Sequence, residues 1–168
     1  MVNSKKRTVS NPYTGEKDNR PDRITMMIRT AELWAKRSTC NRGQNAAIIA
    51  RNGRILSVGY NGSPPGHEHC IEAGCITGPD TGCIRTIHAE ANAIAWAARD
   101  GLSTEGAFIY CTSFPCYTCS KLIIAAGIKE VYYLNNYRIM DGRELFHKSK
   151  IKSYKVEILP NGTVKLHE

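Results

Sequence analysis

The chain has 168 residues, of which 42% are hydrophobic, and this composition indicates one globular domain and excludes a disordered chain. Its 23 basic and 15 acidic residues give a formal net charge of +8, which suits nucleic acid, nucleotide phosphates or simply a lysine-rich solvated surface. No apolar run approaches the ~18 residues of a membrane span, and the polar start lacks the apolar core of a signal peptide. We therefore expect a cytoplasmic protein with no membrane partner.

Residues 1–21 are polar and basic and contain turn signals, so we expect a flexible N-terminal arm followed by a single domain over residues 22–168. The domain is predicted to start with a helix from Asp22 to Ser38, since Asp22 can cap it and apolar residues recur at helical spacing. A β-hairpin is expected over residues 46–58, where Asn-Gly supplies a two-residue turn.

A loop rich in glycine and proline, Gly59 to Gly66, follows the hairpin, and residues 67–87 show no helical or strand pattern. An irregular stretch of this length needs another reason to be ordered, and a bound metal would supply one. The potential metal ligands in this stretch are His67, His69, Cys70, Cys75 and Cys83.

The second half of the chain alternates helices with strands, a pattern typical of a three-layer α/β/α sandwich. Pro115 suits the first turn of a helix and Gly127 suits its end. The predicted elements are helices over residues 88–99, 116–126 and 142–148, strands over 107–111 and 129–134, and a last pair of strands around 161–162.

Two short motifs carry the chemistry: His88-Ala-Glu90, and Pro115-Cys116-Tyr-Thr-Cys119 twenty-eight residues after the histidine. Catalytic zinc takes three protein ligands and keeps a fourth place for water, and one imidazole with two thiolates can supply those three. The joint pattern is typical of zinc-dependent nucleobase deaminases. Each piece alone is common: a core histidine, a redox or structural Cys-x-x-Cys, or a carboxylate at a helix start.

Glu90 follows the histidine by two residues and is not needed as a ligand. Beside a metal-activated water it can protonate a ring nitrogen of the base, after which the water adds to the carbon that bears the amino group. Glu90 then passes a proton to that amino group, and ammonia leaves. We expect backbone N–H groups near Ala89 to hold the carbonyl of the base.

The chain resembles deoxycytidylate (dCMP) deaminases, most of all the bacterial and phage type. The resemblance covers about residues 25–140 and implies hydrolysis of dCMP to dUMP and ammonia, on the way to thymidylate. It also implies the cytidine deaminase fold with a mixed five-stranded sheet, and a homo-oligomer, favouring a hexamer, that dCTP activates and dTTP inhibits. The segments that carry it are Ser38 to Cys40, Gly59 to Gly66, His69-Cys70, Arg85 to Ala93 and Phe114 to Val131.

By the same resemblance, His88, Cys116 and Cys119 ligate the catalytic zinc and Glu90 shuttles protons. Asn61 is implied to contact the sugar of the substrate, Ser113 and Phe114 to line the pocket beside the zinc, and Tyr137 to pack on the nucleotide. The effector triphosphate is expected at Gly59, Tyr60, Asn61 and Gly62. The chain departs from the family at Asn45-Ala46-Ala47, where many members have Val-Gly-Ala.

Seven cysteines are many for a cytoplasmic chain, and their odd number favours metal thiolates over disulfides. In some phage-type members, cysteines matching Cys40 and Cys70 bind a second, structural zinc. Here Cys75 and Cys83 would complete four sulfur ligands, with His69 or His67 as a substitute for one of them. The alternative is a loop with free thiols.

Two other functions compete with a dCMP deaminase. One is a deaminase acting on a polynucleotide, either tRNA adenosine or single-stranded DNA cytidine, which the net charge permits. The glycine-rich loop and the cysteine-rich insert favour a free nucleotide instead, so no stable nucleic-acid partner is expected. The other is a zinc-stabilised nucleotide-binding module without catalysis, and Glu90 argues against it.

Overall fold

A single mixed sheet of six strands, in the order β2-β1-β3-β4-β5-β6, organises the computed structural model, which describes residues 20–78, 82–138 and 140–168. The strands β3, β4 and β5 run parallel, while β1, β2 and β6 pair antiparallel with their neighbours. The strands are β1 (Ala46–Arg51), β2 (Arg54–Tyr60), β3 (Phe108–Ser113), β4 (Glu130–Asn135), β5 (Lys152–Ile158) and β6 (Val164–His167). The helices are α1 (Arg23–Ala35), α2 (Cys70–Ala73), α3 (Ala89–Arg99), α4 (Tyr117–Ala125) and α5 (Gly142–Lys148).

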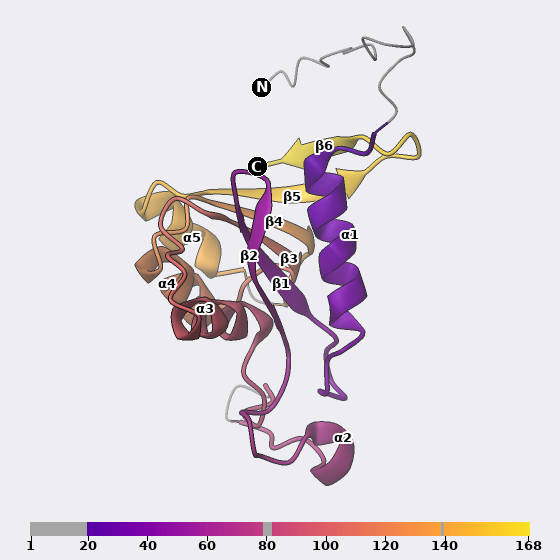
Figure 1. Cartoon of the computed structure of the whole chain (residues 1–168), viewed down its shortest axis with the longest axis vertical. Helices are drawn as coiled ribbons and strands as arrows, with labels where there is room; N and C mark the ends of the chain where they lie inside the picture. The colour runs from indigo at the N-terminus through magenta and orange to yellow at the C-terminus, as the bar shows by residue number, and fades with distance from the viewer. Residues whose placement is uncertain (1–19, 79–81, 139) are drawn as a thin grey trace, which may run out of the picture.

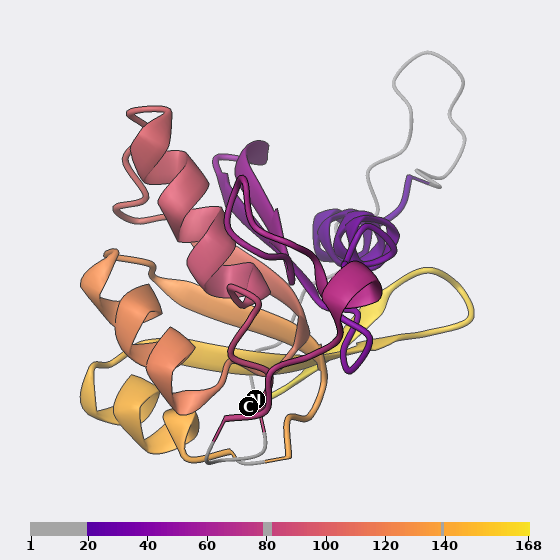
Figure 2. The ribbon, with the colours of Figure 1, turned by 90° about the horizontal axis from the view of Figure 1, so that it is seen from below.

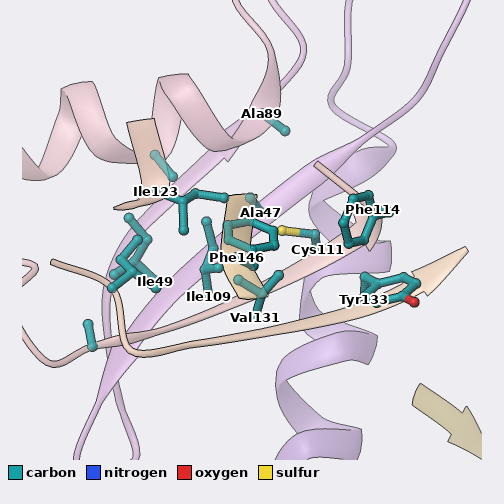
Figure 3. Packing of buried hydrophobic residues seen from close by; sticks show 13 residues of the cluster. Ala47, Ile49, Ala89, Ile109, Cys111, Phe114, Ile123, Val131, Tyr133 and Phe146 are labelled. Atoms are coloured by element: carbon teal, nitrogen blue, oxygen red, sulfur yellow. The ribbon is translucent and has the colours of Figure 1, made fainter. Parts of the chain in front are cut away.

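Helices cover both faces of the sheet, which confirms the predicted three-layer sandwich. The helix α1 lies on one face, whereas α3, α4 and α5 lie on the other (Figures 1 and 2). Each face has its own core. On the α1 side, Ile28 and Ala31 pack against residues of β1, β3 and β4. On the other side, Ala93, Ile123 and Phe146 bring the three helices onto the sheet, as Figure 3 shows for part of the cluster.

The sheet has six strands rather than the five that the family resemblance implied. The extra strand is β6, which pairs antiparallel with β5 at the edge of the sheet. The tight connection that makes this possible centres on Asn161 and Gly162: the Oδ1 atom of Asn161 accepts from the backbone N–H of Thr163, and Gly162 takes a φ of 75°. The sequence signal for a last pair of strands at this point is thus confirmed.

Local signals account for most element boundaries. The side chain of Asp22 accepts from the backbone N–H of Ile24 and so caps α1, as predicted. The β1–β2 turn places Asn52 at φ 54° and Gly53 at φ 74°, the left-handed backbone that a two-residue hairpin requires. The prediction that residues 67–87 lack helix is wrong at α2, a single turn.

The predicted N-terminal arm lies almost wholly outside the described residues, because the description starts at residue 20. No helix in the described part of the chain is both long and apolar enough to cross a membrane. The segment between β2 and α3, which contains α2, extends from one end of the sheet (Figure 1).

Candidate active site

Two helix starts, one at α3 and one at α4, bring the predicted zinc ligands together. His88 is the N-cap residue of α3 and Cys116 is the N-cap residue of α4, while Cys119 lies in the first turn of α4. The α4 start follows directly from β3, so it lies at the carboxyl end of the parallel strands, where open α/β sheets commonly bind ligands. Residues that are far apart in the sequence thus meet, because α3 and α4 begin at the same edge of the sheet.

The three ligand atoms have the spacing that zinc requires. The Nδ1 atom of His88 lies 3.4 Å from the Sγ atom of Cys116 and 3.7 Å from that of Cys119. A tetrahedral zinc with bonds of about 2.0 Å to nitrogen and about 2.3 Å to sulfur separates these atom types by about 3.5 Å. The hydrogen bonds to Cys116 from the Cys119 thiol, the His88 ring and the Cys119 backbone lower the pKa of Cys116 to about 4. A thiolate, the form that binds metal, is therefore already favoured.

Glu90 is buried in the first turn of α3, with 6% of its surface exposed. Burial raises the pKa of this carboxyl above its ordinary value, because desolvation penalises the charged form. Glu90 nevertheless lines the same cavity as His88 and Cys116. A buried carboxyl with a raised pKa, facing a cavity beside a metal site, has the properties of a general acid and base.

A cavity of about 310 Å³ connects this buried site to the surface. The predicted residues Asn61, Ser113, Phe114 and Tyr137 all line it, together with the zinc-site residues. Ring contacts fix Phe114 from behind, since its ring packs edge-on against Tyr133 and Phe146 at centroid distances of 4.9 and 5.9 Å. A rigid aromatic wall beside the metal site suits a planar base.

Asn61 is held by both ends of its side chain. Its Nδ2 atom donates to the backbone carbonyl of Gly43 at 3.0 Å, and its Oδ1 atom accepts from the backbone N–H of Ala89 at 2.9 Å. The Ala89 N–H, expected to hold the carbonyl of the base, is therefore already paired with Asn61. A substrate that uses this N–H has to share it with Asn61 or displace that amide oxygen.

Four cysteines form a second cluster. Three of them lie in the segment between β2 and α3, called the cysteine-rich loop below, and the fourth, Cys40, lies between α1 and β1. Their sulfur atoms lie within 4.8 Å of one another, and the Sγ atoms of two of them, Cys70 and Cys83, are 3.5 Å apart. Tetrahedral zinc–thiolate geometry places sulfurs about 3.8 Å apart, so the set fits a closed structural site. His69 is not part of this set, and its Nδ1 atom pairs with the hydroxyl of Thr39 at 3.0 Å. The cluster comprises Cys40, Cys70, Cys75 and Cys83.

Burial and hydrogen bonds within the cluster change the pKa values of two of its cysteines, Cys70 and Cys83. Burial, together with hydrogen bonds to Cys83 and Cys75, raises the pKa of Cys70. Burial also opposes ionisation of Cys83, but backbone N–H groups of Arg85 and Thr86 and the Cys70 thiol outweigh it and lower the pKa of Cys83 to about 6. The protein alone therefore favours the thiolate of Cys83 and opposes that of Cys70, which a divalent cation would stabilise.

The expected effector loop is largely buried beneath α3. Gly59, Asn61 and Gly62 are all buried, and Gly62 forms a two-way backbone bridge with Ile87 just before α3. The ring of Tyr60 stacks on Trp34 of α1 at a centroid distance of 6.2 Å. In this chain the loop supports the helix that carries His88, so any triphosphate at this loop would act close to the catalytic residues.

Replacing Gly59 with alanine is expected to displace α3. A Cβ atom at Gly59 would lie 2.1 Å from the carbonyl oxygen of Ala89 and 2.3 Å from the backbone nitrogen of Ala93. Such an overlap with helix backbone should lower the free energy of unfolding by about 3 kcal/mol or more. It should also weaken zinc binding, because the shift carries His88 away from Cys116. Thermal unfolding and zinc titration measure the two effects.

Gly101→Ala is the matched control, since Gly101 has a φ of 68° and open space around it. It should cost about 1 kcal/mol from backbone strain alone and leave zinc affinity unchanged. Equal effects of the two substitutions on zinc affinity would contradict the packing role of Gly59.

Several cavity-lining residues were not singled out as functional from the sequence. Arg42, Thr86, Asn136 and Arg138 all line the cavity, and of these only Thr86 lies within a segment that carries the family resemblance. From the sequence, Asn45 is only a departure from the family. The structure instead places it in the cavity wall. For the two arginines of the cavity, Arg42 and Arg138, the sequence offers one signal: Arg42 follows the predicted metal ligand Cys40 by two residues.

Comparisons with known proteins agree with this geometry. The family model for the cytidine and deoxycytidylate deaminase zinc-binding region matches residues 21–135. ComE operon protein 2 of Bacillus subtilis is 45% identical over 76% of this chain and 68% of its own length. Deoxycytidylate deaminase of Schizosaccharomyces pombe is 35% identical over 71% of this chain, which spans only 39% of that protein. The crystal structure of dCMP deaminase from cyanophage S-TIM5 in complex with dCMP and dUMP has a TM-score of 0.68 and 38% identity, over 76% of this chain and 92% of that one.

Proposed function

The chain belongs to the cytidine and deoxycytidylate deaminase family, a family of zinc-binding enzymes, and we propose that it hydrolyses dCMP to dUMP and ammonia. The observation that carries the proposal is the meeting of His88, Cys116 and Cys119 beside the buried Glu90 in one cavity. The similarity to a dCMP deaminase whose crystal structure holds dCMP and dUMP supports the choice of substrate.

Zinc held by His88, Cys116 and Cys119 would act as a Lewis acid and lower the pKa of its water toward ~7. Glu90 would accept a proton from a water molecule beside it and deliver that proton to a ring nitrogen of the cytosine, and burial favours the protonated form of the carboxyl because it raises the pKa. The same carboxyl would then take the proton of the hydroxyl that has added to the ring carbon and pass it to the amino group, so that the C–N bond breaks, the carbonyl forms and ammonia leaves. Phe114 forms an apolar wall against the base and excludes water from the reacting face.

A second zinc, bound by Cys40, Cys70, Cys75 and Cys83, belongs to the same proposal as a structural ion. Two of these residues, Cys40 and Cys83, also line the catalytic cavity. The ion would thus stabilise the cavity wall as well as the cysteine-rich loop, where α2 is only four residues long. His69 is the weaker candidate, because its ring nitrogens do not join the group of four sulfur atoms that lie within 4.8 Å of one another.

The test of function is a substrate panel. The zinc-loaded chain should deaminate dCMP with a higher kcat/KM than dCTP, deoxycytidine, cytidine or a single-stranded oligonucleotide, because one cavity of about 310 Å³ suits a single nucleotide. Preferential deamination of the oligonucleotide would favour a polynucleotide deaminase instead. Zinc binding without turnover of any of these compounds would favour a nucleotide-binding module.

Regulation and assembly are proposed from the family resemblance. We propose a homo-oligomer, with a hexamer favoured, in which dCTP activates and dTTP inhibits through the loop from Gly59 to Gly62. The burial of this loop beneath α3 gives a physical route from effector to catalytic residues. The same panel run with dCTP should convert a sigmoidal dependence on dCMP into a hyperbolic one, while dTTP should do the reverse. Unchanged kinetics with both triphosphates would remove this part of the proposal.

A further inference from the structure

The first turn of α3 carries the candidate catalytic residues and is fastened to the edge of the sheet. His88 is the N-cap residue of this helix, but its side chain makes no capping hydrogen bond. The first backbone N–H groups of a helix have no partners inside the helix, so the first turn frays unless other groups hold it. The strand β2, which is an edge strand of the sheet, packs closely along α3 and can supply such groups.

The residues on either side of His88 are attached to the chain that follows β2. Before the helix, Ile87 and Gly62 exchange two backbone hydrogen bonds, of 2.9 and 3.3 Å. At the helix start, the backbone N–H of Ala89 donates to the Oδ1 atom of Asn61 at 2.9 Å. These contacts hold the beginning of the first turn, and the end of that turn depends on another contact.

Asn92 holds the end of the first turn. Its backbone N–H donates to the carbonyl of His88 at 2.9 Å, which is the first hydrogen bond within the helix. Its side-chain Nδ2 atom donates to the backbone carbonyl of Tyr60, the last residue of β2, also at 2.9 Å. One residue thus joins the peptide of the candidate zinc ligand to the sheet, and Glu90 lies in the turn between the two bonds.

The acceptor of the Asn92 amide has a fixed position. Just past the end of β2, the N–H of Asn61 donates to the carbonyl of Asn45 at 3.0 Å, and successive residues of an antiparallel strand direct their polar groups to opposite sides. The carbonyl of Tyr60 therefore faces away from β1 and toward α3. The ring of Tyr60 stacks on Trp34 with an angle of 11° between the ring planes, which restrains this peptide further.

We propose that Asn92 is a positioning residue of the candidate active site: its side chain fixes the first turn of α3 on β2 and thereby sets the directions of His88 and Glu90. The residues that line the cavity include His88 and Glu90 but not Asn92, so Asn92 acts through these two residues and does not touch the substrate. The inference rests on the proposed function for the reaction that is followed, whereas its spectroscopic test needs no turnover.

Asn92→Leu removes the donor and keeps a side chain of similar size. In the metal-loaded full chain it should lower kcat for dCMP by about tenfold to a hundredfold, the cost of misplacing reacting groups by about 1 Å, and change KM by less than about threefold. With Co²⁺ in place of zinc, the visible absorption spectrum should change as well, because it depends on the geometry of the ligands around the metal. Asn92→Gln keeps an amide donor and should restore both kcat and the spectrum.

Ser57→Ala is the matched control, because it breaks another hydrogen bond between the same strand and the same helix. The hydroxyl of Ser57 donates to the backbone carbonyl of Ala93 at 2.7 Å, beyond the first turn. Its loss should lower the midpoint of thermal unfolding about as much as Asn92→Leu does, by about 2–4 °C. It should leave kcat and the cobalt spectrum unchanged.

Equal losses of kcat in Asn92→Leu and Ser57→Ala would overturn the positioning role, because both bonds would then act only through the stability of the fold. An unchanged kcat or an unchanged cobalt spectrum in Asn92→Leu would overturn it as well. Should Asn92→Leu fail to fold, Asn92→Asp takes its place in the same comparison, since it keeps the shape of the side chain and lacks the donor.

The outcome is separable from that of the proposed function. A chain that fails to deaminate dCMP but shows the spectral change in Asn92→Leu and not in Ser57→Ala would refute the activity and keep the positioning role. Turnover of dCMP with the same kcat in the wild type and in Asn92→Leu would do the opposite.

Discussion

Glu90→Gln is expected to reduce dCMP turnover by about 10⁴-fold while the chain retains its zinc. Glutamine has nearly the same shape but cannot accept the proton of the water or deliver it to the base, and both transfers are assigned to this carboxyl. The zinc ligands His88, Cys116 and Cys119 do not include Glu90, so metal content should stay at the wild-type level. Single-turnover kinetics and elemental analysis on the same preparation measure the two quantities.

The substitution should also leave the metal-free chain at least as stable as the wild type at neutral pH. Burial raises the pKa of Glu90 in the folded state, so the folded chain loses stability as the pH rises from the unfolded pKa through the folded one. A neutral amide does not carry this cost. Glu32→Gln, which replaces a half-buried carboxylate on α1 that pairs with Arg29, is the control and should keep full turnover. Retained turnover in Glu90→Gln, or loss of zinc from it, would show that Glu90 is not the proton carrier.

Cys75→Ser is expected to lower the zinc content from two ions per chain to one. Removing one of four thiolates should weaken zinc binding at the second site by more than about 100-fold. Loss of a group that only hydrogen-bonds to a metal ligand already lowers metal affinity by about 10–100-fold, and loss of a ligand itself should lower it further. The cysteine-rich loop should then lose order, and dCMP should bind more weakly because Cys40 and Cys83 form part of the cavity wall. Mass spectrometry under native conditions counts the ions directly.

Cys111→Ala provides the control for Cys75→Ser. Cys111 is fully buried in the core beside β1 and belongs to neither cluster, so its loss should cost packing energy but leave both ions bound. A wild-type chain that carries one zinc when purified without chelator would refute the structural site. A Cys75→Ser variant that still carries two would show that three thiolates and another ligand suffice.

Much of the fold was predictable because its signals are local. The Asn52-Gly53 turn, the Asp22 cap and Gly127 after α4, with a φ of 69°, each determine an element end through backbone geometry or a single hydrogen bond. The prediction for Pro115 is wrong, since it lies one residue before the N-cap of α4 rather than in the first turn. The number of strands was not predicted by the resemblance, since β6 depends on a turn near the C-terminus that lies beyond the matched segments. One-turn helices such as α2 carry too few residues for a periodic signal.

The candidate catalytic residues could be proposed for a different reason: the spacing of His88, Glu90, Cys116 and Cys119 in the sequence is a chemical pattern that can be recognised without knowledge of the fold. The other residues that line the cavity lack such a pattern. Asn45 and Arg138 lie ninety-three residues apart and meet in one cavity only through the order of the strands β1, β3 and β4. The pairing of the Ala89 N–H with Asn61 is likewise a tertiary contact, which sequence spacing does not encode.

The rate of dUMP formation from dCMP by the zinc-loaded chain tests the central claim most directly. The site geometry predicts one ammonia released per dUMP, and loss of turnover when a chelator removes the metal from His88, Cys116 and Cys119. It also predicts a higher kcat/KM for dCMP than for a single-stranded oligonucleotide. Absence of dUMP from a chain with full zinc content, alongside deamination of the oligonucleotide, would contradict the account.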